Sequence, residues 1–232
     1  LGIKDYRFEL SLRDPEDKVK YYPDDEMWNH AEDTLRKVLD HIGINYTEKI
    51  GEAAFYGPKL DVQVHPAVGN EYTLSTCQLD FCLPMRFDLT YVDKDGSKKT
   101  PVVLHRAIFG SLDRFIAYYL EERKGLFPLW LSPVQVNIIP VNNEYHLSYA
   151  ENLLERLKKE NIRAELDDCD EKLGYKMRES VIQKKNYAII IGNKEVENNT
   201  ISFRKCGSEE TTTLNIDEFI NLIIDEIKTR KY

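Results

Sequence analysis

Alternating apolar and polar side chains mark much of the first half of this chain as strand. The first dozen residues alternate in this way, and the pattern returns over 60–64, 76–81 and 87–92. A period of two is typical of strands with one covered face. Residues 24–42 instead place apolar side chains at the spacing of an amphipathic helix. The first half therefore combines several short strands with at least one long helix.

The ends of the predicted helix 24–42 carry their own signals. Its first turn contains three acidic residues, Asp24, Asp25 and Glu26, whose negative charge is favourable at the positive end of the helix dipole. Gly43 is expected to end the helix. Its expected buried stripe is Trp28, Ala31, Leu35, Val38, Leu39 and Ile42. This helix should therefore pack one face against the strands.

A hairpin and a second helix complete the first half. Residues 93–97 have the composition of a hairpin turn, 101–104 return the chain as a strand, and 110–123 read as a helix. An antiparallel sheet with helices packed on one side is consistent with this order. The first half is therefore expected to be an α+β domain.

The pattern changes character after a segment rich in glycine and proline. Gly125, Pro128 and Pro133 interrupt both periodicities, so we expect domains at 1–128 and 129–232. The second half alternates expected strands (134–140, 163–167, 187–192, 200–205, 210–214) with expected helices (144–160, 174–185, 216–229). Strand–helix alternation predicts a mixed α/β domain with a mostly parallel sheet.

The last helix, 216–229, carries the most complete set of signals. Asn215 followed by Glu218 matches a capping box. Its expected buried stripe is Ile216, Phe219, Ile220, Ile223, Ile224 and Ile227. This helix should therefore close the second domain.

Composition narrows the class of protein. Of 232 residues, 42% are hydrophobic and 31% charged, which is ordinary for a soluble globular protein. No apolar run approaches the roughly 18 residues that span a membrane, and residues 1–5 do not begin a signal peptide.

We expect a cytoplasmic protein that is a segment of a longer chain. Its cysteines, Cys77, Cys82, Cys169 and Cys206, are expected to be free thiols. The net charge of −8 argues against indiscriminate polyanion binding but allows a local RNA-binding face.

The segment 102–115 carries the most chemistry. An apolar run contains His105, turns at Gly110 and enters a helix with Arg114 four residues later. This order aims an imidazole, backbone N–H groups and a fixed cation at one region, which suits a bound triphosphate. Taken alone, His105 is more typical of a satisfied core histidine, and Arg114 is more typical of a solvated helix face.

As a complete string, 102–115 resembles motif 3 of class II aminoacyl-tRNA synthetases, in the form found in threonyl-tRNA synthetases. Further similar strings are 24–28, 56–59, 78–81, 131–136, 171–179 and 192–197. The resemblance implies the last part of a class II catalytic domain, without motifs 1 and 2, followed by an anticodon-binding domain. It also implies an enzyme that joins threonine to its tRNA with ATP and Mg²⁺.

The resemblance assigns roles to residues of the first domain. Arg114 would contact the ATP γ-phosphate, with Ser111 and Thr76 as further ATP contacts. Tyr56, Lys59 and Gln78 would line the threonine and adenylate pocket. His105 would be one of three zinc ligands, and zinc would distinguish threonine from valine through the substrate hydroxyl. No other Cys or His here matches the remaining ligands, so we expect this chain alone not to hold zinc.

In the second domain, the resemblance points to anticodon recognition. Glu195, Arg204 and Arg178 are candidates for base reading, and Asp170 stands where the family often has Asn. A basic face is expected from Lys172, Lys176, Arg178, Lys184, Lys185, Lys194, Arg204 and Lys205. A run of charges is also typical of an ordinary solvated face.

Two alternatives remain open at this point. Thr73 stands where most members of the family have glutamine, so the chain could be a paralog that binds tRNA or a tRNA-like RNA without catalysis. A weaker alternative is a partner-binding module that uses an exposed sheet edge. For the isolated chain we expect negligible adenylate formation, and for the intact enzyme a homodimer.

Overall fold

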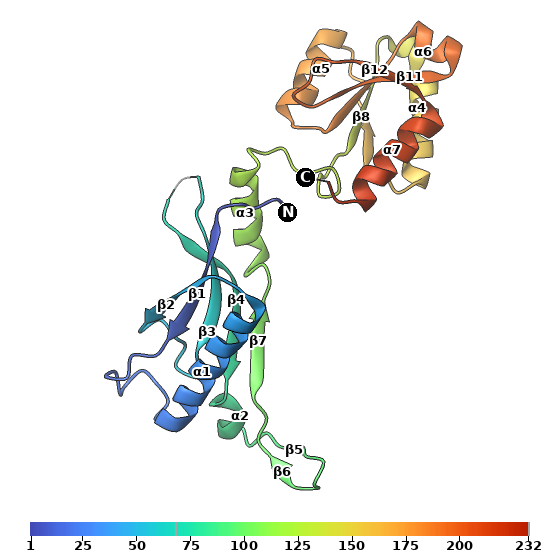
Figure 1. The fold of residues 1–232 in the computed structure, drawn as a ribbon. Coiled ribbons are helices and arrows are strands. Elements are labelled where there is room, and N and C mark those ends of the chain that lie inside the picture. Colours follow the sequence, from blue (N-terminus) through green and yellow to red (C-terminus); the bar gives the residue numbers. More distant parts are fainter. Residues whose placement is uncertain (68, 232) are drawn as a thin grey trace. The chain divides into compact units, whose positions relative to one another are not determined.

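The computed structural model describes residues 1–67 and 69–231. It contains two compact units: Ile3–Glu122 forms one, and Arg123–Tyr232 belongs to the other (Figure 1). Each unit has its own sheet and its own hydrophobic core. The two units are described separately below.

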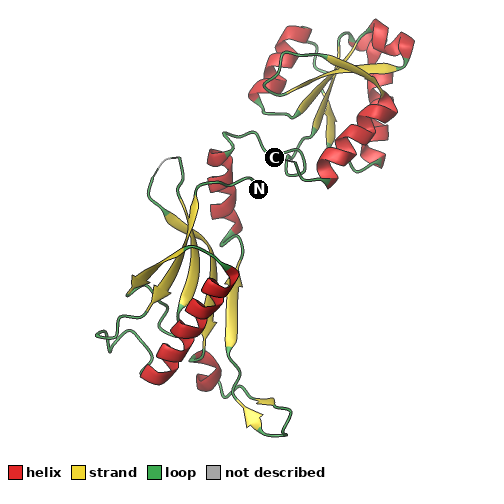
Figure 2. Cartoon of the chain, viewed as in Figure 1, coloured by secondary structure: helices red, strands yellow, loops and turns green. Residues whose placement is uncertain are grey.

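The first unit is a five-stranded sheet with helices and a small outlying hairpin (Figure 2). Its elements are β1 (Tyr6–Leu12), α1 (Asp25–Ile42), β2 (Tyr46–Ile50), β3 (Lys59–Val64), β4 (Tyr72–Asp80), α2 (Leu83–Arg86), β5 (Tyr91–Val92), β6 (Lys98–Lys99), β7 (Val103–Ala107) and α3 (Leu112–Glu122). The sheet order is β2-β1-β3-β4-β7. Only the β1–β2 pair is parallel, so the expected antiparallel sheet is confirmed in its main part.

Helix α1 begins and ends where its sequence signals predict. The Asp24 carboxylate accepts a hydrogen bond from the Met27 N–H, and Gly43 ends the helix in the left-handed conformation. Its stripe is confirmed in part: Leu39 packs with Leu10 and Leu12 of β1. Val38 and Ile42 are 49% and 55% exposed, so their expected burial is wrong.

The strand expected over 87–92 is also wrong in its first part. Helix α2 precedes it because the Asp80 carboxylate accepts from the Cys82 and Leu83 N–H groups and Pro84 occupies the first turn. Only β5 is extended, and it pairs with β6 across the predicted turn at 93–97. Residues 87–90 therefore form the turn and loop that follow α2, and they are not strand.

The second unit is a mixed sheet with helices around it. Its elements are β8 (Val136–Pro140), α4 (Asn143–Lys159), β9 (Ala164–Leu166), α5 (Leu173–Ile182), β10 (Tyr187–Ile191), α6 (Asn193–Asn198), β11 (Thr200–Lys205), β12 (Thr212–Asn215) and α7 (Ile216–Lys228). The sheet order is β12-β11-β10-β8-β9. The pairs β9–β8 and β8–β10 are parallel, whereas β10–β11 and β11–β12 are antiparallel.

The core of the second unit lies between this sheet and the stripes of α4 and α7. Phe219 is fully buried, and its ring centroid lies 4.9 Å from that of Phe203 on β11. The Asn215–Glu218 capping box at the start of α7 is confirmed. No helix among the described residues is long and apolar enough to cross a membrane.

Candidate functional site

One face of the first sheet is polar, and strand register places the expected substrate residues on it. Lys59 on β3 pairs with Gln78 on β4, and Gln78 pairs with His105 on β7. Residues paired across neighbouring strands share a face of the sheet. The three side chains therefore form a row, which the sequence alone could not show.

A tight turn brings Tyr56 to the end of this row. A Cβ atom at Gly57 would lie 1.7 Å from the Leu79 carbonyl oxygen, so only glycine allows this approach to β4. The Tyr56 hydroxyl donates a hydrogen bond to Gln78 Oε1. Burial and the negative charge of Asp80 raise the pKa of Tyr56, which keeps the hydroxyl protonated as a donor.

Lys59 is held by a buried carboxylate that sequence analysis missed. Asp61 is 1% exposed, and its Oδ2 pairs with the Lys59 ammonium and accepts from the Ser11 hydroxyl. Asp61 Oδ1 and the hydroxyl of Thr76, its partner across the strands, are buried and have no partner among the described residues. Leaving a buried polar atom without a hydrogen bond costs free energy. Asp61 Oδ1 and the Thr76 hydroxyl are therefore candidates for hydrogen bonds with a ligand.

The missed residues are the buried polar side chains of this face. Besides Asp61 they include Glu9, Gln63 and Asp80, all under 9% exposed. Sequence analysis assigned no role to any of them, although Asp80 lies within the motif string 78–81. Glu9 and Gln63 are bonded to each other, because Gln63 Nε2 donates to Glu9 Oε1 at 3.1 Å.

His105 lies at the β7 end of the row and contacts Asp80. Its Nε2 lies 2.7 Å from Asp80 Oδ2, and its ring centroid lies 5.5 Å from that of Tyr56. No group of three or more His, Cys, Asp or Glu in the described part of the chain could hold a metal ion. His105 alone offers too few ligands for zinc, so no step of the chemistry is assigned to zinc here.

Arg114 and Ser111 lie at the start of α3. The Ser111 hydroxyl accepts a hydrogen bond from the Arg114 N–H at 3.3 Å. The exposed Arg114 guanidinium lies 5.9 Å from the ring centroid of Tyr72 and forms no ion pair within the described ranges. Gly110 turns the chain with φ of +60°. Arg114 is therefore an uncompensated cation beside the sheet.

A groove in the second unit brings together two of the expected anticodon residues. Arg178 on α5 and Arg204 on β11 both line a cavity of about 420 Å³. The Ser180 hydroxyl also lines it and is buried with no partner in the part of the chain described. Two guanidinium groups beside an unsatisfied hydroxyl suit a nucleobase and its phosphate.

Glu195 lies on α6, away from the groove, and is engaged within the protein. Its carboxylate accepts from the Ser202 hydroxyl at 2.6 Å and from the Gly192 N–H at 3.0 Å. It thereby caps α6, a helix that sequence analysis missed. Asp170 is exposed and does not line the groove.

Glu195→Gln is expected to destabilise the second unit at neutral pH and much less in acid. Burial opposes ionisation, but hydrogen bonds from Ser202 and Gly192 outweigh it and hold the pKa of Glu195 below its usual value. A carboxyl with a lowered folded pKa stabilises the fold above its unfolded pKa, and this contribution is lost as pH falls through the folded pKa. Urea unfolding at both pH values, with the exposed Glu197→Gln as control, measures it. An equal loss at both pH values would contradict this assignment.

The expected basic face needs a correction. Lys176 is 2% exposed, and its ammonium donates to the carbonyl oxygens of Asp167 and Pro140 at 3.1 and 3.5 Å. Lys185 is mostly buried and pairs with Glu165. The remaining exposed lysines are Lys172, Lys184, Lys194 and Lys205. Lys176 therefore ties the ends of β8 and β9 together instead of facing RNA.

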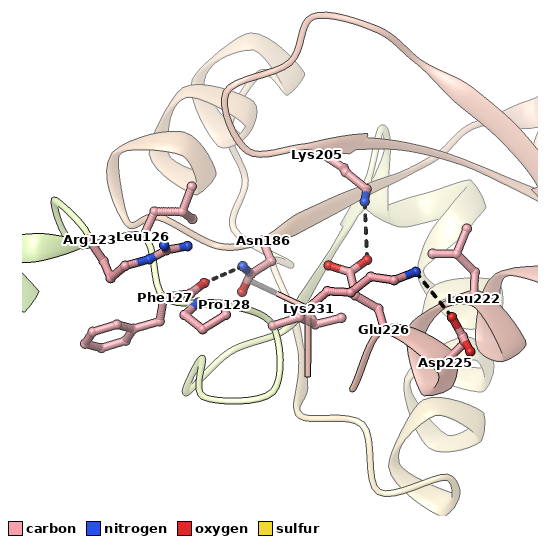
Figure 3. A pocket seen from close by; sticks show the side chains of 11 residues that line it. Arg123, Leu126, Phe127, Pro128, Asn186, Lys205, Leu222, Asp225, Glu226 and Lys231 are labelled. Carbon is pink, nitrogen blue, oxygen red and sulfur yellow. Dashed lines mark hydrogen bonds and ion pairs between the residues drawn. The ribbon is translucent and has the colours of Figure 1, made fainter. Parts of the chain in front are cut away.

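A cavity of about 650 Å³ in the second unit is lined by none of the expected catalytic, ATP-binding or anticodon residues, although Lys205 of the expected basic face lines it (Figure 3). Segment 123–129 forms one wall, where Asn186 Nδ2 donates to the Phe127 carbonyl at 2.8 Å. On the other side Lys205 pairs with Glu226 at 3.2 Å. The Asn186 contact holds segment 123–129 in place, and we assign both contacts a structural role.

Comparisons with known proteins match two separate parts of the chain to known domain families. Residues 14–123 match the family model of the tRNA synthetase class II core domain (G, H, P, S and T), and residues 135–226 match that of the anticodon binding domain. The threonine–tRNA ligases of Staphylococcus aureus strains bovine RF122 / ET3-1 and Newman are each 54% identical to this chain over 231 residues. These matches cover 100% of the chain but 36% of each ligase.

A solved structure gives the same result at the level of the fold. The RNA binding domain of the threonyl-tRNA synthetase from Cryptosporidium parvum Iowa II is 31% identical, with a TM-score of 0.86. That similarity covers 95% of this chain and 55% of the other. The chain therefore belongs to the threonyl-tRNA synthetase family, and it comprises part of the class II core domain followed by the anticodon-binding domain.

Proposed function

We propose that this chain is the C-terminal part of a threonine–tRNA ligase. Residues 1–128 would complete the site that forms threonyl-adenylate, and residues 129–232 would bind the anticodon loop of threonine tRNA. The observation that carries this proposal is the row of Lys59, Gln78 and His105 on one polar sheet face, with Tyr56 bonded to it. A protein that only bound RNA would have no need of this row.

The reaction has two steps. A threonine carboxylate oxygen attacks the α-phosphorus of ATP, and the bond to the leaving pyrophosphate breaks. A ribose hydroxyl at the end of the tRNA then attacks the adenylate carbonyl, loses its proton, and AMP leaves. Mg²⁺, where bound, supplies charge neutralisation at the phosphates. The whole ligase is proposed to be a cytoplasmic homodimer.

Arg114 is proposed to neutralise charge at the triphosphate. Its guanidinium is exposed and has no carboxylate partner in the described ranges, so it loses no ion pair when a phosphate binds. A planar, permanently charged donor suits γ-phosphate oxygens better than lysine does. Ser111 orders the first turn of α3, and the unpaired Thr76 hydroxyl is proposed as a further polar contact to ATP.

Tyr56, Gln78 and Lys59 are proposed to orient the threonyl group. Because the Tyr56 hydroxyl donates to Gln78 Oε1, the Gln78 amide N–H groups remain as donors for a carboxylate or phosphate oxygen. Lys59 would contribute positive charge while Asp61 fixes its position. Preorganised donors of this kind stabilise the charge that develops in acyl and phosphoryl transfer.

The groove lined by Arg178 and Arg204 is proposed to receive the anticodon. Bases splayed from a loop are read by hydrogen bonds, and phosphates are held by cations. Glu195 and Asp170 are proposed as flanking contacts. Both carboxylate oxygens of Glu195 already accept hydrogen bonds within the protein. To bind RNA, Glu195 would therefore replace its hydrogen bond from Ser202 with one from the RNA.

A chimeric enzyme tests this proposal. The chain would replace the matching 36% of the S. aureus ligase, and threonylation of tRNA by the chimera would be measured. We expect clear activity, a loss of about 10²-fold or more in Arg114→Ala, and little change in the matched arginine control Arg36→Ala on α1. A folded chimera without threonylation would contradict the proposal and favour the non-catalytic RNA-binding paralog.

A further inference from the structure

The two oxygens of the buried Asp80 carboxylate have different hydrogen-bond partners. Oδ1 accepts from the Cys82 N–H at 3.0 Å and from the Leu83 N–H at 2.9 Å. Oδ2 lies 2.7 Å from His105 Nε2. Asp80 itself has no exposed surface. The first oxygen thus caps α2, and the second faces the imidazole.

This arrangement fixes where the imidazole carries its proton. An ionised carboxylate only accepts hydrogen bonds, so His105 Nε2 must donate to Oδ2. A neutral imidazole with a proton on Nε2 has none on Nδ1. Among the described residues, nothing forms a hydrogen bond with His105 Nδ1. Nδ1 therefore keeps a free electron pair.

We propose that Asp80 is a positioning residue for His105: it holds the ring in the Nε2–H tautomer so that Nδ1 serves the site as an electron-pair donor. The same carboxylate anchors the first turn of α2, so the ring orientation is tied to the backbone that follows β4. A carboxylate behind an imidazole commonly fixes both its tautomer and its orientation. The identity of the group that binds to Nδ1 rests on the proposed function. The position of the proton on the His105 ring does not rest on it.

Asp80→Asn separates this role from a general structural one. The carbonyl of asparagine must take over the two N–H bonds of α2, because an amide NH₂ cannot accept them. The NH₂ group then faces His105 Nε2, which must become an acceptor. The proton moves to Nδ1, and the free electron pair on that atom is lost. The helix cap remains, so we expect the variant to fold.

The test is nitrogen-15 NMR of histidine-labelled chain in mildly alkaline buffer, where imidazoles are neutral. The chain has five histidines, and the signals of His105 are identified by their loss in His105→Gln. We expect Nε2 protonated and Nδ1 bare in the wild-type chain, and the reverse in Asp80→Asn. Asp33→Asn, which removes an exposed carboxylate on α1, should leave the His105 signals unchanged.

Two outcomes would overturn the proposal: a proton on Nδ1 in the wild-type chain, or an unchanged tautomer in a folded Asp80→Asn variant. The wild-type spectrum keeps the test decisive if that variant does not fold. Failure of the proposed function is distinguishable, because it would appear as a chimera without threonylation beside an unchanged tautomer result.

Discussion

Phe219→Ala is expected to destabilise the second unit by about 3–5 kcal/mol. The side chain is fully buried, and its ring contacts those of Phe203 and Tyr187, with centroids 4.9 and 5.7 Å away. Truncation would leave a cavity between α7 and the sheet that these packed aromatic rings cannot fill. This is a large fraction of the stability of an ordinary domain.

The loss of stability in Phe219→Ala should be confined to the second unit. Hydrogen exchange followed by mass spectrometry should show faster exchange in peptides from β10 and β11, with β3 and β4 unchanged. Tyr145→Ala is the matched control, because Tyr145 is also an aromatic residue on a helix but is 68% exposed. A similar loss in the control, or equal deprotection of the first unit, would contradict the assignment of two separate cores.

Arg204→Ala and Arg178→Ala are each expected to weaken binding to threonine tRNA by about 10-fold, within a range of roughly 1–3 kcal/mol. Both side chains line the groove beside the buried Ser180 hydroxyl. Replacing either one removes a cation and a planar set of donors from the place where a base would lie. Fluorescence anisotropy with a labelled transcript measures the change.

Arg156→Ala controls for the loss of one positive charge. Arg156 lies on α4, pairs with Asp217 and does not line the groove. We expect its substitution to cost much less than either groove arginine. If all three variants weaken binding equally, the contribution is long-range attraction to phosphates, and the groove does not read bases.

Sequence signals were most reliable where chemistry within one segment decides the structure. Asp24 and Gly43 marked the ends of α1, and Asn215 with Glu218 marked the start of α7. These signals are local, because each cap uses a side chain within a few residues of the N–H group that it satisfies. The boundaries of α3 and most strands followed from periodicity in the same way.

The wrong expectation for Lys176 has a cause that lies outside its own helix. Lys176 looked like a surface cation, but two carbonyl oxygens from β8 and from the residue after β9 hold it in the interior. A tertiary contact therefore overrode the local pattern at Lys176.

The candidate site shows the same division between local and distant information. Tyr56, Lys59, Gln78 and His105 could be named from motif strings, but only strand register shows that three of them form a row. Asp61, which holds Lys59, lies outside the motif strings, and Asp80, which contacts His105, lies within 78–81 but was assigned no role. Buried positioning residues are therefore the part of this site that required the structure.

The measurement that tests the central claim most directly is binding of this chain to a threonine tRNA transcript and to the same transcript with its anticodon changed, at two salt concentrations. Phosphate contacts weaken steeply with salt and carry no sequence information. We expect binding to fall sharply with the changed anticodon at both salt concentrations. Equal binding to both transcripts, with strong salt dependence, would mean phosphate attraction alone and would contradict an anticodon-reading second domain.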